Sequence, residues 1–411
     1  MRALGAFERL YQRRQQKTTM HFCIAAELAD DLDALMLAAA LRAVQQRHPL
    51  LNVDPEDHPQ AGLGFYRPAY VPPIPITVIY PEAGRSWRDV VATELTRPFD
   101  TPCAPMMRVV LLGSGPSTRA AIVLTVDQVI ADGLSAANIL RDVFAALNDP
   151  ALQALQAPPS QEELIGALRD GQPAAVQGAN DQPQTAQPDW LSTRSTTRPF
   201  DGAAPHICTV CFDTDLTGRL VARARAEQTT AHSALVSAMT QVIIESGRNE
   251  YVRTLTPVDL RDHIGVRDCV WLYFAPTRTT LIREHLTDLW DTARTVGDQL
   301  AAARLLPALL AASAAAEQYI PVDATTRDAG DFMVDGLSYE AGTSNLRVLD
   351  MGAPGAVRPV AIWGPAIHAQ VQGELNTGTC TFNGQLRVVT ASQHPLPGYL
   401  DCVRDVLDAA C

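Results

Sequence analysis

The sequence predicts an α/β protein of two halves joined by a polar segment, and three observations support this. Short apolar runs typical of β-strands alternate with amphipathic helical patterns along most of the 411 residues. The alternation stops once, where Pro, Gln, Ser and Thr dominate. It then resumes and continues to the last residue. We therefore expect an N-terminal half over 1–150, a partly disordered crossover or linker over 151–203, and a C-terminal half over 204–411.

In the N-terminal half, each element follows from a local pattern. The run MHFCIAAEL predicts a strand, and the segment after it has apolar residues at helical spacing and an acidic start. Ser86 is an N-cap residue before a second helix, and the turn residues SGPS separate two buried strands. The predicted elements are strand 20–28, helix 29–49, strand 75–80, helix 86–95, strands 106–113 and 119–127, and helix 134–148.

The C-terminal half shows the same kinds of signal. Gly247 ends a long helical pattern, and Asn383-Gly384 between two strand-like runs predicts a hairpin. The predicted elements are strand 206–213, helices 216–228 and 230–247, strand 252–261, a mostly helical stretch over 282–316, strands 359–375 and 379–392, and a closing helix 398–411.

Composition excludes several functional classes. The net charge of −12 argues against a nucleic-acid partner, because such proteins present a basic face. No apolar run reaches the ~18 residues of a membrane span, and the N-terminus lacks the apolar core and cleavage site of a secretory signal. We therefore expect a cytoplasmic protein with no membrane partner.

Eight cysteines are too few for a disulfide framework in a chain of this length. Cys208 and Cys211 have the spacing of half a zinc site, but no second pair follows, and on one strand they would face opposite ways. The sequence thus favours buried thiols and predicts no metal site.

The stretch TVDQVIADGLSAANIL, residues 125–140, ends a buried strand in acidic residues. A carboxylate at such a position is costly unless it is paired or used in chemistry. Asp127 is therefore either a structural carboxylate bonded to backbone donors or a functional acid. Asp132 comes directly before a predicted helix, so it can cap that helix, pair with a cation or act chemically, with Ser135 as a polar residue of the first turn.

Several segments, taken in order, resemble the condensation-domain superfamily, which includes nonribosomal peptide condensation domains and stand-alone polyketide-associated acyltransferases. The opening run MHFCIAAEL to RHPLL resembles the family's first strand, helix and turn, and RPFDTPCAPMMRVVLL resembles its FD…PL-R stretch. DQVIADG takes the place of HHxxxDG, TPVDLRDHIG resembles PVNLR, and TSNL (343–346) resembles an SN-G turn. Together these matches cover most of the chain.

The resemblance implies two chloramphenicol-acetyltransferase-like halves, each a two-layer α/β (α+β) sandwich, arranged as a V-shaped pseudo-dimer with a central channel. Substrates enter from opposite faces, often on the phosphopantetheine arm of a carrier protein or on coenzyme A. In the family, the second His of HHxxxDG is the usual base and the Asp forms a structural ion pair. At these positions the chain has Asp127 for the first His, Gln128 for the second, Asp132 for the Asp and Gly133 for the Gly.

Gln128 is the main departure from that pattern, because an amide does not accept a proton at neutral pH. It can bind a carbonyl, or it is a relic of lost catalysis. Asp127 points away from Gln128 on a regular strand, and it is a weaker base than His unless burial raises its pKa. The stretch also matches DxxxxDxxS, through Asp127, Asp132 and Ser135, which heterocyclisation domains of this superfamily carry instead of HHxxxDG. We expect Asp127 and Gln128 to be the catalytic residues.

The remaining site predictions concern partners and channel walls. Arg261 is expected to pair with Asp132, since a buried carboxylate favours a bidentate cation. His48 and His368 are expected to be structural histidines and not replacement bases. The residues expected to shape the channel or bind substrate, for example by bonding a carbonyl or thioester arm, are Gly133, Ser135, Ser344 and Asn345.

Two functions fit these residues. The first is a monomeric, stand-alone condensation or acyltransferase-like enzyme of natural-product or lipid biosynthesis. It would act on acyl groups held by an acyl or peptidyl carrier protein or by CoA, with no permanently bound cofactor, and form an amide or ester or close a ring with loss of water. The second is a non-catalytic binding or scaffold protein, which the absence of both histidines favours. The sequence names neither the donor nor the small-molecule acceptor.

Overall fold

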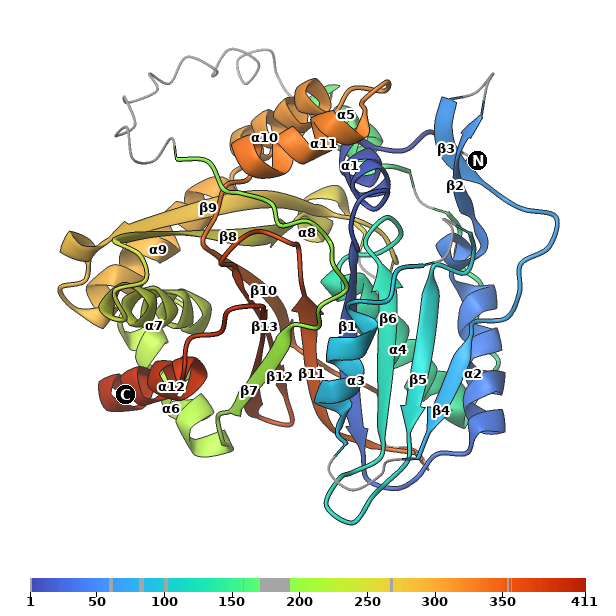
Figure 1. The fold of residues 1–411 in the computed structure, drawn as a ribbon, viewed down its shortest axis with the longest axis horizontal. Helices are drawn as coiled ribbons and strands as arrows, with labels where there is room; N and C mark the ends of the chain where they lie inside the picture. Colours follow the sequence, from blue (N-terminus) through green and yellow to red (C-terminus); the bar gives the residue numbers. More distant parts are fainter. Residues whose placement is uncertain are drawn as a thin grey trace.

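The structure of the chain, a computed structural model, has two lobes that lie side by side (Figure 1). One lobe contains a five-stranded sheet and the other a six-stranded sheet, and β2 (Asp54–His58) and β3 (Gly62–Tyr66) form a separate two-stranded sheet. The structure describes residues 2–58, 62–80, 85–99, 103–157, 159–170, 193–266, 269–352, 355 and 357–411.

The five-stranded sheet has the order β11-β1-β6-β5-β4 and is covered on both faces. Alternate residues of β6 face opposite ways, so that Ile122 packs in the core with α2 and α4, whereas Val123 packs with Trp87 of α3. All of β6 is therefore buried up to its last residue, Asp127. The elements are β1 (His21–Leu28), α2 (Ala34–Arg47), η1 (Pro49–Asn52), β4 (Ile76–Ile79), α3 (Trp87–Glu94), β5 (Met107–Leu112), β6 (Ala121–Asp127) and α4 (Gly133–Asn148).

The six-stranded sheet has the order β7-β13-β12-β10-β8-β9, with α6, α7, α9 and α12 beside it (Figure 1). Asn383 and Gly384 both have positive φ, 51° and 73°, as the tight β12–β13 hairpin requires. The elements are β7 (His206–Cys211), α6 (Thr214–Ala226), α7 (Ala231–Glu245), β8 (Tyr251–Asp259), α8 (Arg261–Ile264), β9 (Phe274–Ile282), η4 (Arg283–His285), α9 (Leu289–Ala303), β10 (Ala341–Val348), β12 (Leu375–Phe382), β13 (Gln385–Ser392) and α12 (Tyr399–Ala410).

Strand β11 (Pro359–Ile367) joins the two lobes. In the sequence it lies between β10 and β12 of the six-stranded sheet, yet it pairs antiparallel with β1, from Phe22 opposite Ile367 to Leu28 opposite Pro359. The halves expected over 1–150 and 204–411 therefore share one sheet. A smaller helical layer covers the top of both lobes in Figure 1, formed by α1 (Ala6–Arg14), α5 (Gln161–Asp170), α10 (Leu306–Tyr319), α11 (Thr326–Asp331) and the π-helical η5 (Phe332–Gly336).

Several elements differ from the sequence-based expectation. Helix α5 lies inside the segment described as a linker, where Ser160 and Glu163 form a capping box: the backbone N–H of each donates to the other's side chain, at 2.9 and 3.2 Å. Residues 171–192 of the segment 151–203, which was predicted to be a partly disordered linker, lie outside the described residues. The TSNL sequence is not a turn but part of β10, which is irregular between Asn345 and Val348. The short β2–β3 hairpin and helix α1 were also not predicted.

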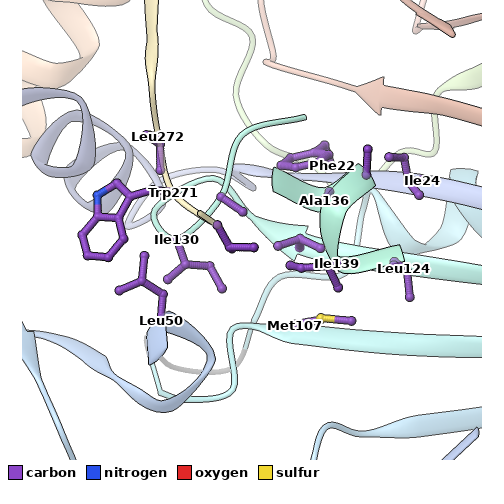
Figure 2. Packing of buried hydrophobic residues seen from close by; sticks show 14 of the residues in the cluster. Phe22, Ile24, Leu50, Met107, Leu124, Ile130, Ala136, Ile139, Trp271 and Leu272 are labelled. Atoms are coloured by element: carbon purple, nitrogen blue, oxygen red, sulfur yellow. The ribbon is translucent and has the colours of Figure 1, made fainter. Parts of the chain in front are cut away.

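The core beside the site contains residues of both halves. Trp271 and Leu272, which follow α8, lie with Ile130 and Leu50 of the N-terminal half in the same buried cluster (Figure 2). All four side chains are almost completely excluded from solvent. The loop after β6 is therefore packed against the C-terminal half, which fixes the position of the residues that follow Asp127.

Among the residues that the structure describes, no single helix is both long and apolar enough to cross a bilayer. Helices α9 and α10 reach that length and composition only together, and they meet at an angle of 70°.

Candidate active site

A cavity of about 150 Å³ lies where the two lobes meet. Its wall is mostly apolar and comes from both halves, which is the usual composition of a small-molecule site. Among the apolar lining residues are Phe7, Met20, Phe22, Leu255, Phe274, Met333 and Leu346. The polar and charged lining residues are Tyr11, Gln128, Asp132, Asp259, Arg261, Tyr273, Tyr339, Thr343, Ser344, Asn345, Asn376 and Thr377.

Gln128 is the first residue after β6, and its side chain lines the cavity. Its backbone N–H donates to the Met20 carbonyl at 2.9 Å, which holds the chain against β1 as it leaves the strand. Its side-chain amide makes no hydrogen bond within the described part of the chain. The amide is thus available to a ligand as both donor and acceptor.

Asp127 does not line this cavity. Its carboxylate, in a side chain only 2% exposed, accepts a hydrogen bond from the Val129 backbone N–H at 2.8 Å. Burial raises the pKa of Asp127 to about 7, although the Val129 hydrogen bond and the charge of Arg108 act in the other direction. Its expected catalytic role stays a prediction, and one that this position does not favour.

Asp132 is the N-cap residue of α4 and one of the links between the lobes. Its Oδ1 accepts the Ser135 backbone N–H at 2.8 Å, and its Oδ2 accepts the Tyr273 backbone N–H at 3.1 Å. The first bond is the one expected of an N-cap aspartate, and the second reaches the C-terminal half.

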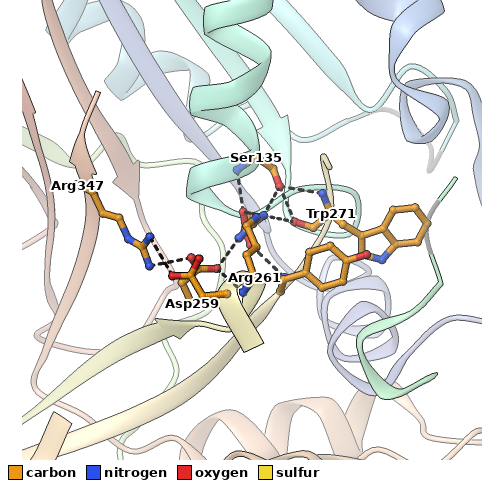
Figure 3. Close-up of polar contacts among 8 residues, drawn as sticks. Ser135, Asp259, Arg261, Trp271 and Arg347 are labelled. Atoms are coloured by element: carbon orange, nitrogen blue, oxygen red, sulfur yellow. Dashed lines mark hydrogen bonds and ion pairs between the residues drawn. The ribbon is translucent and has the colours of Figure 1, made fainter. Parts of the chain in front are cut away.

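Arg261 of the C-terminal half binds Asp132 directly, within a network that also contains Ser135, Asp259, Trp271 and Arg347 (Figure 3). Its Nη2 lies 2.8 Å from Asp132 Oδ1, and its Nη1 lies 2.9 Å from Asp259 Oδ1. Arg347 closes the network at 2.9 Å from Asp259 Oδ2. Burial disfavours the charged form of Arg261 and so lowers its pKa. The carboxylates of Asp132 and Asp259 have the opposite and larger effect, so the pKa of Arg261 stays above its usual value. Asp132 and Asp259, the two carboxylates that line the cavity, are thus each paired with an arginine.

Ser135 lies behind the cavity wall and not in the channel where it was expected. It is fully buried, its hydroxyl donates to the Trp271 carbonyl at 2.6 Å, and it accepts the Trp271 backbone N–H and Arg261 Nη2, each at 2.8 Å. The partners in all three hydrogen bonds, Trp271 and Arg261, belong to the C-terminal half, so Ser135 contributes to the contact between the two halves. Asp127, Asp132 and Ser135 consequently do not form one catalytic cluster.

Gly133, Ser344 and Asn345 all line the cavity. Gly133 begins α4 so close to the C-terminal half that a Cβ there would lie 3.0 Å from Leu346 Cδ2 and 3.5 Å from Ser344 Oγ. A glycine is therefore what allows the helix to approach β10 at this point.

The histidines named from the sequence lie outside the cavity wall. His48 caps the end of α2 and its Nε2 is 2.8 Å from Asp142 Oδ2, in a side chain that is fully buried. His368 follows β11 and is also buried.

Tyr339 and Asn376 are cavity residues that the sequence did not indicate. Tyr339 precedes β10 and Asn376 lies in β12, and neither belongs to a recognisable motif. Only the pairing of β10 with β12 brings them to one wall. Within the described ranges, no group of three or more His, Cys, Asp or Glu side chains has the arrangement of a metal site.

No family model matches the chain, and no curated protein sequence does so either. Solved structures do match over nearly its whole length. The polyketide synthase associated protein 5 from Mycobacterium tuberculosis matches with a TM-score of 0.66 and 16% sequence identity, over 99% of this chain and 97% of that chain. The first condensation domain of the CDA synthetase matches with a TM-score of 0.66 and 14% identity, over 100% of this chain and 95% of that chain.

A third match is the EpoB NRPS cyclization-docking bidomain from Sorangium cellulosum, with a TM-score of 0.63 and 16% identity, over 99% of this chain and 85% of that chain. The chain therefore has the fold of condensation domains, and the fold class predicted from its sequence is confirmed. At these identities the likeness establishes the fold, and activity has to be argued from the cavity.

Proposed function

We propose that this chain is an enzyme of natural-product or lipid biosynthesis that transfers thioester-bound acyl groups in the cavity between its lobes, without a histidine base. The acyl donor is a phosphopantetheine thioester on a carrier protein or on CoA. The acceptor is a small amine, which needs less help from a base than an alcohol does. Ring closure with loss of water on a tethered acyl group is the other outcome that the same site would allow.

The observation that carries this proposal is the position of Gln128. It stands, through the sequence resemblance, at the position of the family's second His, directly after β6, and its amide lines an apolar cavity into which it can donate a hydrogen bond. A preorganised donor aimed at a thioester carbonyl stabilises the charge that develops on oxygen during acyl transfer. Holding two reactants in one cavity lowers the barrier further, because their encounter no longer costs translational and rotational entropy.

The intact contact between the halves supports the same conclusion. Asp132 and Arg261 are both largely buried, and a buried ion pair is seldom a net source of stability. Here it fixes the start of α4 against the C-terminal half beside Gln128, which is what a site that positions two substrates requires.

The test uses octanoyl-CoA and an octanoyl carrier protein as donors, because the cavity wall is mostly apolar. Each donor is incubated with hexylamine, hexanol or cysteine ethyl ester, and products are identified by mass spectrometry. We expect an octanoyl amide with at least one donor. A product lighter by one water molecule with cysteine ethyl ester would identify ring closure instead.

Gln128→Ala is the informative variant, and Gln241→Ala is its matched control, since Gln241 bonds Glu245 on α7 away from the cavity. Product formation that falls in the first variant and not in the second supports the proposal. Donor binding in calorimetry without product in any combination would identify a non-catalytic binding protein. Absence of both binding and product would overturn the proposal.

A further inference from the structure

A further carboxylate, that of Glu374, lies directly behind the cavity wall. Glu374 precedes β12 and is 2% exposed. The Tyr339 hydroxyl donates to its Oε2 at 2.9 Å and the Asn376 side-chain amide donates to the same oxygen at 2.7 Å. Its Oε1 accepts the Ala369 backbone N–H at 2.9 Å. Two of these donors, Tyr339 and Asn376, belong to residues that line the cavity.

In the part of the chain that the structure describes, no Lys or Arg forms an ion pair with Glu374, unlike most buried carboxylates. Within the described residues, the only basic group at ion-pair distance is His368, whose Nε2 lies 3.4 Å from Oε1. Burial and the charge of Arg198 lower the pKa of His368 to about 4, so this ring is neutral near pH 7. The charge of Glu374 raises the pKa of Arg14 of α1, although burial outweighs it, and the charge of Tyr11 in the same helix raises the pKa of Tyr339. Neither forms an ion pair with the carboxylate.

This environment differs from that of the two carboxylates that line the cavity. Asp132 and Asp259 each form an ion pair with Arg261. Burial raises the pKa of Glu374 to about 7, although the hydrogen bonds from Tyr339, Asn376 and the backbone lower it in part. A carboxylate that titrates near neutral pH can both accept and return a proton during a reaction.

We propose that Tyr339 and Glu374 form a proton relay that serves the acyl transfer, with Tyr339 as the catalytic residue facing the cavity and Glu374 as the positioning residue that holds its proton. This rests on the function proposed above, and it supplies the base that Gln128 cannot be. Both relay residues belong to the C-terminal half. Asp127 and Gln128, which take the positions of the family's two histidines in the sequence resemblance, belong to the N-terminal half.

The step balances without any added reactant. The amine nitrogen attacks the thioester carbonyl carbon and forms the C–N bond. The nitrogen then loses a proton to the Tyr339 oxygen as the Tyr339 proton passes to Glu374. When the tetrahedral intermediate collapses, the C–S bond breaks, the thiolate takes a proton from Tyr339, and Glu374 returns its proton to Tyr339.

The kinetic test compares Tyr339→Phe and Glu374→Gln with Tyr66→Phe, which removes one hydroxyl hydrogen bond, to the Gly62 carbonyl, in the β2–β3 hairpin. The acceptor is methoxyamine, which titrates below the pH range of the assay. We expect kcat/KM to fall by about 100-fold in the two relay variants, the usual size of a general acid–base effect, and to be unchanged in Tyr66→Phe. In the parent, kcat/KM should rise through pH 7, and this limb should disappear in Glu374→Gln.

A second measurement does not depend on turnover. Infrared difference spectra between acid and alkaline pH should show the carbonyl band of a protonated carboxylic acid that titrates near pH 7. Glu374→Gln should remove this band and Tyr339→Phe should shift it. Asp127→Asn is the control, because Asp127 titrates in the same range but lies outside the cavity wall. The band assigned to Glu374 should survive that substitution.

The outcomes separate the two proposals. Absence of turnover in the parent with every donor and acceptor would overturn the proposed function and the relay with it. Turnover that keeps its rate and pH profile in Glu374→Gln would overturn the relay alone. If Glu374→Gln fails to fold, Tyr339→Phe and the infrared titration of the parent still decide, and a Glu374 that is ionised throughout the range overturns the relay.

Discussion

Arg261 Nη2 lies 2.8 Å from Asp132 Oδ1 and 2.8 Å from Ser135 Oγ, so one guanidinium of the C-terminal half holds the first turn of the helix that begins beside Gln128. Because Asp132 also caps that helix, a single carboxylate fixes both the local structure and the contact between halves. The geometry of the cavity therefore depends on an interaction that spans 129 positions in the sequence.

Removing this carboxylate should destabilise the protein. Asp132→Ala leaves Arg261 buried with one partner fewer and removes the helix cap, so we expect the free energy of unfolding to fall by about 3–5 kcal/mol. Urea unfolding followed by circular dichroism measures this. Asp215→Ala, which breaks an exposed pair with Arg219, is the control and should cost less than about 1 kcal/mol. Equal stability of the parent and Asp132→Ala would contradict the structural role.

Gln128→Ala should leave the stability of the protein nearly unchanged and lower its activity. Since its amide makes no hydrogen bond within the described residues, the melting temperature should hardly change. Loss of one preorganised donor typically lowers kcat by about 100-fold or more, and we expect a loss of this order in acyl transfer. A variant as active as the parent would show that Gln128 is a relic and not a ligand for the carbonyl.

Asp127→Asn tests whether the raised pKa of this carboxyl affects stability. The folded-state pKa of about 7 lies above the ordinary 3.8, so folding favours the protonated form. The stability that this group contributes is fully present below pH 3.8 and is lost as the pH rises to 7. Asparagine does not ionise, so at pH 8 the variant should be more stable by up to about 4 kcal/mol, and at pH 4 the two should be nearly equal.

The same variant also tests a catalytic role. Because Asp127 does not line the cavity, we expect acyl transfer to change by only a few-fold in Asp127→Asn. A loss of about 100-fold would instead show direct acid–base work by this carboxyl. Melting curves at two pH values and one rate measurement therefore distinguish a structural carboxylate from a catalytic one.

Gly133→Ala should affect the contact between halves. Its methyl group would lie 3.0 Å from Leu346 Cδ2 and 3.3 Å from Pro365 Cγ, so these side chains must shift, and we expect a cost of about 1–2 kcal/mol with reduced acyl transfer. Gly218→Ala in α6 is the control, because nothing lies within 4 Å of the added Cβ. It should raise stability by about 0.5–1 kcal/mol, as alanine does in a helix. Thermal melts of both variants give the comparison.

The sequence predicted the elements that have strong local patterns, and it indicated that the residues directly after β6 belong to the site. Strand β6, helix α4 and the β12–β13 hairpin follow from apolar periodicity and turn residues, which act over a few positions. Asp132 and Arg261 could be paired through the resemblance to a family, although far apart in the sequence. The SQEE start of α5 is a capping signal that would have indicated this helix.

The wall formed by Tyr339, Glu374 and Asn376 could not be predicted in the same way. Their positions depend on the parallel pairing of β10 with β12 and on the chain that returns from β11, which are long-range features. The resemblance of TSNL to the family's SN-G turn placed Ser344 and Asn345 in a turn, yet in the structure they belong to strand β10. Tertiary pairing decides the structure there.

The placement of β11 has a consequence for how the chain is made. Without β11, β1 is the edge strand of its sheet, and the backbone N–H and C=O groups along that edge stay unpaired until residue 367 has left the ribosome. At roughly 5–20 residues per second, synthesis from the end of α4 to that point takes on the order of 10–40 s. For that time the nascent N-terminal lobe exposes an unpaired edge to neighbouring chains. The yield of folded protein should therefore depend on how crowded the ribosomes are and on chaperones that cover β1.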